Sequence, residues 1–222
     1  MTDFAFIVFH FLYEYTVLSK NPLLHISRDG GYAELFQYLK EFWSIALLSF
    51  LAIQTRSRSY LSWSSFFCYL LIDDSLSIHE RLGDFIAEKL AFSALLKLRP
   101  VDFGELLVFG VSGLFFLTLI AIAYYLGDSF FRRASRKLIM LLLVLAFFGV
   151  AVDMLHVVFK FSRFEPLFSV LEDGGEMVVM SVMMCFIFSL SGRIQEGTNT
   201  TEIAEGKPLT QVVKMKRNSQ TW

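Results

Sequence analysis

Acidic side chains and histidines stand inside the hydrophobic segments of this chain, and these residue types could carry chemistry. A charged side chain in the hydrocarbon of a bilayer costs about 2.5–3.5 kcal/mol on insertion scales. Each such group therefore needs a partner, a bound ion or water. The foremost candidates lie within such a segment or directly follow one: Asp73, Asp74, His79, Asp153 and His156. They predict a buried polar site.

Helical spacing places several acids and histidines on shared faces. Asp153 and His156 are three residues apart, and Glu172 and Glu176 are four apart. Helix bundles ligate one or two metal ions with Glu-x-x-His pairs, and Asp-x-x-His can act in the same way. Oxygen ligands with one or two imidazoles suit Zn, Fe or Mn. We therefore predict a divalent metal site with the ligands Asp73, Asp74, His79, Asp153, His156 and Glu172.

Two glutamates are candidate catalytic bases beside this metal. Glu80 directly follows His79, and Glu176 stands in the last hydrophobic segment. A bound metal lowers the pKa of water toward 7, so hydrolysis of a lipid-like substrate is the natural chemistry for such a site. The same acids could instead carry protons or cations in a small transporter. An ion-responsive sensory or structural subunit is a third class that the sequence leaves open.

Helix capping is a competing explanation for some of the acids. Asp102 and Glu105 follow Pro100 with the spacing of an acidic capping box. Asp173 and Glu176 have the same spacing at the start of the last hydrophobic segment. Capping alone can account for the first pair, whereas the second pair remains open to either role.

Ion pairing is the competing explanation for the acids inside the hydrophobic segments. Lys40 is the base best placed to pair with them, and one lysine cannot neutralise several carboxylates. Glu41 could be neutralised by the adjacent Lys40 or by Arg28. Where Lys40 points therefore decides how many acids remain without a cation.

The composition identifies the class of protein that holds these groups. Hydrophobic residues make up 55% of the 222 residues, and 25 residues are Phe, so the bilayer must solvate much of the chain. We predict an all-α, polytopic integral membrane helix bundle with about six transmembrane helices of ~20 residues. Five spans result if the first segment lies in the interface. The candidate spans are Phe4–Leu18, Leu35–Ile53, Tyr60–Ile78, Phe103–Leu126, Leu138–Phe159 and Glu172–Leu190.

Two further segments have their own character. His79–Leu98 alternates charged and apolar residues at helical spacing, which predicts an amphipathic helix on the membrane surface. Residues 192–222 are polar without periodicity and predict a flexible tail. The expected organisation is one transmembrane domain over residues 1–191, followed by this tail.

Basic residues predict the orientation in the membrane. Arg132, Arg133, Arg136 and Lys137 lie in one short connection, which the positive-inside rule places in the cytoplasm. Both termini then lie in the cytoplasm, and the acids and histidines gather in the outer leaflet. Short loops favour a bacterial inner membrane. The net charge of -1 argues against nucleic acid as a partner. The expected partners are membrane lipids and, in a homo-oligomer, further copies of the chain.

Overall fold

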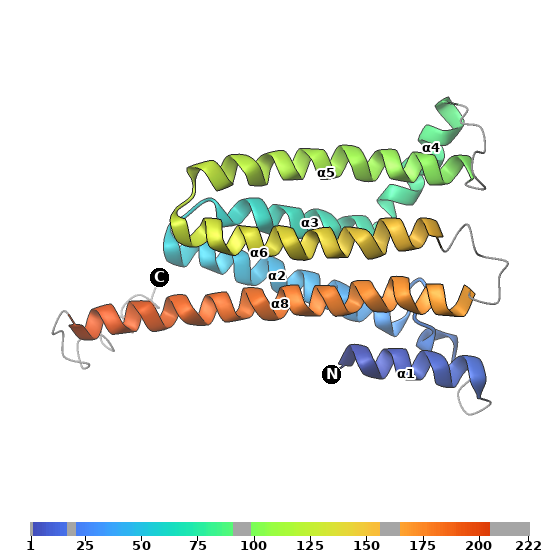
Figure 1. Ribbon diagram of the computed structural model, residues 1–222, viewed down its shortest axis with the longest axis horizontal. Coiled ribbons are helices and arrows are strands. Elements are labelled where there is room, and N and C mark those ends of the chain that lie inside the picture. The colour runs from blue at the N-terminus through green and yellow to red at the C-terminus, as the bar shows by residue number, and fades with distance from the viewer. Residues whose placement is uncertain (1, 17–20, 91–98, 156–164, 205–222) are drawn as a thin grey trace, which may run out of the picture.

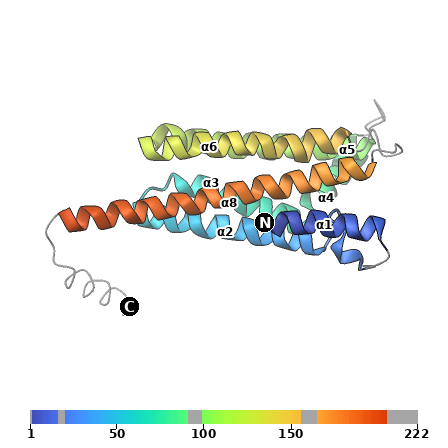
Figure 2. The same ribbon diagram turned by 60° about the horizontal axis from the view of Figure 1, so that its bottom comes forward.

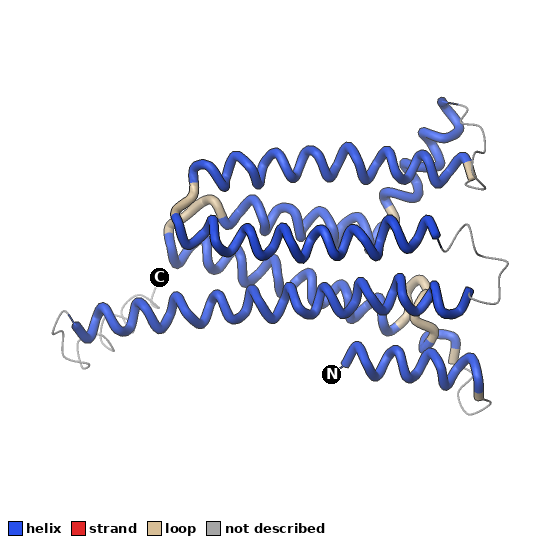
Figure 3. The backbone as a smooth tube through the Cα atoms, in the orientation of Figure 1, coloured by secondary structure: helices blue, strands red, loops and turns tan. Residues whose placement is uncertain are grey.

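The computed structural model of the protein describes residues 2–16, 21–90, 99–155 and 165–204. These residues form helices and connections without any strand, as Figure 3 shows, and the all-α prediction is confirmed for them. The elements are α1 (Thr2–Tyr15), η1 (Pro22–Leu24), α2 (Tyr32–Thr55), α3 (Tyr60–Leu76), α4 (Ile78–Leu90), α5 (Pro100–Leu126), α6 (Ser129–Ala146), the π-helix η2 (Phe147–Val152) and α8 (Glu165–Ala204).

The long helices lie side by side and form one elongated bundle (Figure 1). α8 packs against α1, α2 and α6, and α4 folds back along the start of α5. Figure 2 shows α5 and α6 on one side of the bundle and α1 and α2 on the other, with α3 and α8 between them. Gly83 and Gly104 allow α4 and α5 to approach closely, because a side chain on Gly104 would meet the Gly83 carbonyl.

Three helical segments are long and apolar enough to cross a membrane: Pro100–Leu126, Ser129–Leu155 and Leu167–Arg193. They correspond to the last three predicted spans. α3 is shorter, at 17 residues, and α2 carries charged residues in its first half. α1 has only 14 residues, or about 21 Å at 1.5 Å per residue, so it is too short to cross hydrocarbon of about 30 Å.

The apolar core fills the end of the bundle at which α2 ends and α3 and α6 begin. Trp63, Phe67 and Phe131 are fully buried there, and the Trp63 indole N–H donates to the Ser135 hydroxyl at 3.0 Å. α8 contributes Met180 to this core, together with further apolar residues of its second half. The polar residues discussed below therefore gather at the opposite end of the bundle.

The ends of two helices, α6 and α8, differ from what the sequence predicts. α6 does not continue as a regular α-helix but passes into η2 just before Asp153. α8 continues to Ala204, so helical structure extends into the segment that the sequence predicts as a flexible tail from residue 192. Residues 205–222 of that tail lie outside the described residues.

Candidate metal-binding cavity

A cavity of about 720 Å³ opens at the end of the bundle away from the apolar core. The first halves of α2, α5 and α8 line it together with the end of α3, with α4 and with η2. Acids dominate its wall: Asp29, Glu34, Glu41, Asp74, Glu80, Asp84, Glu105, Asp153, Glu172, Asp173 and Glu176. The structure thus brings together acids from helices that are far apart in the sequence.

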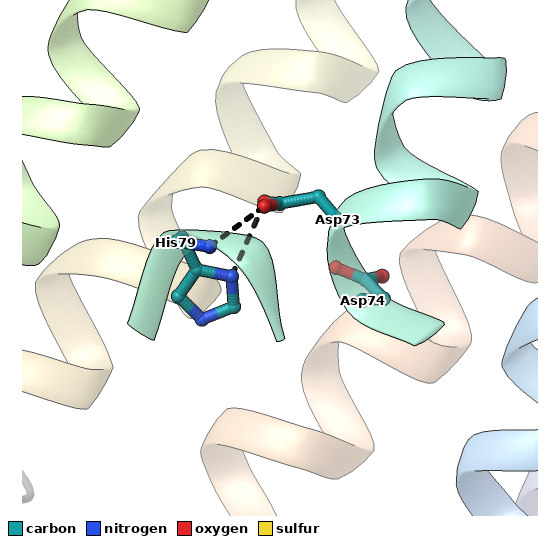
Figure 4. Close-up of side chains that lie close together, drawn as sticks. All are labelled: Asp73, Asp74 and His79. Carbon is teal, nitrogen blue, oxygen red and sulfur yellow. Dashed lines mark hydrogen bonds and ion pairs between the residues drawn. The ribbon is translucent and has the colours of Figure 1, made fainter. Parts of the chain in front are cut away.

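The junction between α3 and α4 gathers three possible metal ligands. α3 ends at Leu76, and its C-cap Ser77 has a left-handed φ of 47°, so the chain changes direction before α4 begins. The Asp73 carboxylate then accepts the backbone N–H of His79 at 2.9 Å and so caps the start of α4. Ligand atoms of Asp73, Asp74 and His79 lie within 4.8 Å of one another (Figure 4).

Asp73 also fixes the orientation of the His79 ring. Its second oxygen lies 3.2 Å from His79 Nδ1, and the Phe109 ring packs on the imidazole with centroids 4.8 Å apart. Burial lowers the pKa of His79, but the hydrogen bond and charge of Asp73, with the charge of Asp74, raise it more, so the net shift is upward. Because Nδ1 faces Asp73, Nε2 is the ring nitrogen left for a metal ion.

Asp73 and Asp74 are adjacent in sequence but differ in their surroundings. Asp73 is fully buried, and both its oxygens contact His79, which makes it an orienting residue. Asp74 lines the cavity, and its backbone carbonyl lies 3.0 Å from the Tyr38 hydroxyl, which also contacts Glu34. Asp74 is therefore the carboxylate of the pair that can reach an ion in the cavity.

The floor of the cavity, which we define as Glu41 and Glu176, carries two further carboxylates. Glu41 is 1% exposed, its carboxyl group lies against that of Asp74, and Glu176 is within electrostatic reach. The Oε2 atom of Glu41 is buried and has no hydrogen-bond partner among the described residues. Gly149 provides the space for Glu176, because a Cβ at residue 149 would meet Glu176 Oε1. Glu41 was not among the predicted site residues, because its position in the sequence suggests pairing with a base.

Lys40 is within electrostatic reach of Glu41, but its ion pair is with Asp3 and not with this floor. Its ammonium group donates to Asp3 Oδ1 at 3.1 Å and to the Met177 carbonyl at 2.8 Å, and it is 2% exposed. The other Asp3 oxygen accepts the Ser181 hydroxyl at 2.6 Å. The expected pairing of Lys40 with the acids inside the spans is thus replaced by a pairing with α1, which was not predicted from the sequence.

Arg99 lines the cavity but is held at its edge by Asp102. The guanidinium donates to Asp102 Oδ1 at 2.7 and 3.0 Å, and the Arg99 backbone N–H donates to Oδ2 at 2.6 Å. Asp102 therefore caps α5, but from the third position of the helix with Arg99 as the N-cap, and the predicted capping box of Asp102 with Glu105 does not form. Glu105, the other member of that pair, instead faces the cavity.

The remaining predicted site residues occupy different parts of the wall. Glu80 is exposed on α4 at the cavity rim, whereas Asp153 and Glu172 are half-buried and interact with one another. The π-helix η2 directly precedes Asp153, and π-helical turns frequently occur at functional sites. No sequence signal indicated this turn. His156, the second predicted imidazole ligand, lies outside the described residues.

These features define a helical membrane-type protein with an acid-lined cavity that could hold cations. The chain belongs to the family described as Domain of unknown function (DUF8692), which matches residues 7–190. That range contains all the residues that line the cavity. No curated protein and no solved structure matches the chain.

Proposed function

We propose that this protein is a multi-pass membrane hydrolase that binds a divalent metal ion in the acid-lined cavity and acts on a lipid-like substrate. One observation carries the proposal: ligand atoms of Asp73, Asp74 and His79 lie within 4.8 Å of one another beside the acid-lined cavity. Lys40 and Arg99 form ion pairs with Asp3 and Asp102, and Arg28 is exposed on the cavity wall. A metal ion would supply the positive charge that the cavity acids need.

The residues have distinct roles in this proposal. Asp74 and His79 Nε2 are metal ligands, and Asp73 holds the His79 ring as carboxylates commonly do behind metal-bound histidines. The ion would lower the pKa of a coordinated water toward 7. The water oxygen would form a bond to the carbonyl carbon of an ester, and Glu80, at the cavity rim beside His79, would take the released proton. Glu80 would return that proton to the ester oxygen as the bond between this oxygen and the carbonyl carbon breaks.

A one-sided site fits the distribution of polar and apolar residues better than a transport path does. The cavity acids lie at one end of the bundle, and fully buried Trp63, Phe67, Phe131 and Met183 fill the other. A transporter for protons or cations needs polar groups that continue to the second surface. The described residues of the apolar core offer few such groups, which favours an enzyme over a transporter.

The proposed membrane arrangement uses five full spans. α2 and α3 run beside α5, α6 and α8 in the same bundle, so we assign them as spans as well. α1 is a short helix that covers part of α8, and α4 lies at the surface with exposed Leu82, Phe85 and Leu90. This reduces the expected number of about six spans. Arg132, Arg133, Arg136 and Lys137 lie in the first turns of α6, and under the positive-inside rule they favour a cavity in the outer leaflet. The short loops favour a bacterial inner membrane.

Cysteine labelling tests this arrangement. Cys68 and Cys185 are first replaced by Ser, and a single cysteine is introduced at the exposed positions Ser129 or Glu88. A membrane-impermeant maleimide added to intact cells should label Glu88→Cys and not Ser129→Cys. The reverse pattern would invert the orientation and remove the cavity from the outer leaflet.

Metal binding itself is tested with the full chain purified in detergent. Metal content by mass spectrometry and thermal unfolding are measured before and after chelation, and Zn²⁺, Mn²⁺ or Fe²⁺ is then returned. A metal at a hundredfold excess over Kd should stabilise the fold by about 2.7 kcal/mol. Asp74→Asn should lose this response. Asp128→Asn, at the cap of α6 far from the cavity, should keep it. If no metal stabilises the unmodified chain, the proposal is wrong.

A further inference from the structure

Glu41 is the least explained charged residue in the cavity. Only 1% of its surface is exposed, and its Oε2 atom has no hydrogen-bond partner among the described residues. Its carboxyl group lies against that of Asp74. Two carboxylates offer only acceptor oxygens, so this contact requires a proton or a cation between them.

Lys40 and Arg99 are hydrogen-bonded to other partners, and Arg28, which also lines the cavity, is an exposed residue of its wall. Lys40, the neighbour of Glu41, points to Asp3 and the Met177 carbonyl. Arg99 forms a fork with Asp102 at the cavity edge. Burial of a carboxylate is costly, and although Lys40 is within electrostatic reach of Glu41, neither Lys40 nor Arg99 forms an ion pair with the floor.

The backbone around the floor leaves room for a carboxylate. Gly149 stands in η2, where a Cβ would strike Glu176 Oε1. Glu176 is also within electrostatic reach of Asp74 and Asp153. Carboxylates from α2, α3 and α8 therefore converge from three directions, which is how helix bundles form sites for pairs of metal ions.

We infer that the cavity holds a second divalent cation, bound between Glu41 and Glu176 and bridged by Asp74 to the ion at His79. This inference rests on the proposed function, because it adds a second ion to the metal site assigned there. Two ions held by a shared carboxylate would lie about 3.5–4 Å apart, the separation typical of two-metal hydrolases. Such a pair holds both the attacking and the leaving oxygen of an ester or phosphoester substrate.

Mn²⁺ is the probe for this inference, because electron paramagnetic resonance detects coupling between two nearby Mn²⁺ ions. The metal-free full chain in detergent is titrated with Mn²⁺, and bound ions are counted. The unmodified chain should bind about two ions with a coupled spectrum. Glu41→Gln removes the charge with little change in volume, and it should bind about one ion with an uncoupled spectrum.

A matched variant and a fold control complete the experiment. Glu88→Gln, on the exposed face of α4 outside the cavity, should behave like the unmodified chain. Circular dichroism shows whether Glu41→Gln folds, and Glu176→Gln provides a second route to the same loss. One uncoupled ion in both the unmodified chain and Glu41→Gln would overturn the second cation and leave the proposed function standing. No bound ion in either would overturn both.

Discussion

The buried Lys40–Asp3 ion pair tests whether the charges that stabilise the fold act independently of the acids that line the cavity. Lys40→Met removes a side chain that is 3% exposed and leaves Asp3, at 10%, without its cation. Removal of one partner from a buried pair costs about 3–5 kcal/mol. Asp3 retains the Ser181 hydroxyl at 2.6 Å, so we expect the lower end, about 3 kcal/mol.

Thermal unfolding in detergent measures this cost. For a chain of this size, about 3 kcal/mol corresponds to a fall in Tm of roughly 6–12 °C. The double variant Asp3→Asn/Lys40→Met should recover most of the loss, because neither charge is then left alone. The rise in Tm on adding metal should persist in Lys40→Met, since Lys40 does not contact the cavity acids. Loss of that metal response in Lys40→Met would refute the separation of the two charge systems.

Three further predictions concern the cavity. Glu80→Gln should lower the rate of ester hydrolysis roughly 10²–10⁴-fold, as expected for loss of a general base, and an unchanged rate would exclude Glu80 as that base. Gly149→Ala should weaken Mn²⁺ binding because the new Cβ would displace the Glu176 carboxyl, whereas Gly113→Ala, which has open space, should not. In the metal-free chain, the raised pKa of His79 means that its charged form is favoured by folding. Its contribution to stability is complete below the unfolded pKa of about 6.5 and is lost as pH rises through the higher folded pKa. Tm measured against pH should therefore fall over that window, and His79→Gln should flatten the fall.

Local spacing made part of the site predictable. Asp73, Asp74 and His79 lie within seven consecutive residues around a helix end, so their short separation in the sequence keeps them close although the helix breaks at Ser77. The sequence also allowed Glu176 to be predicted as a site residue, because acids gather near the same ends of several predicted spans. The division of roles between Asp73 and Asp74 could not be predicted from the sequence, since it depends on which carboxylate the turn at Ser77 directs toward α4.

The partner of Lys40 and the π-helical turn before Asp153 could not be predicted from the local sequence. Glu41 follows Lys40 directly, so their adjacency suggests a pair, whereas the fold turns Lys40 toward Asp3 in α1. The π-helical turn before Asp153 has no residue signature, because Phe147–Val152 is apolar and resembles a continuation of the preceding helix. The all-α class and the three most apolar spans depend only on composition and segment length, and these features were predicted correctly.

The Lys40 contacts also set an order for assembly during synthesis. Asp3 precedes Lys40 in the chain, so the first two helices can form their ion pair as soon as α2 enters the membrane. The Met177 carbonyl and the Ser181 hydroxyl arrive only with α8, after the rest of the described bundle has been made. A fusion or deletion that displaces Asp3 would therefore disturb the insertion of α2 and the later docking of α8 as well as α1 itself.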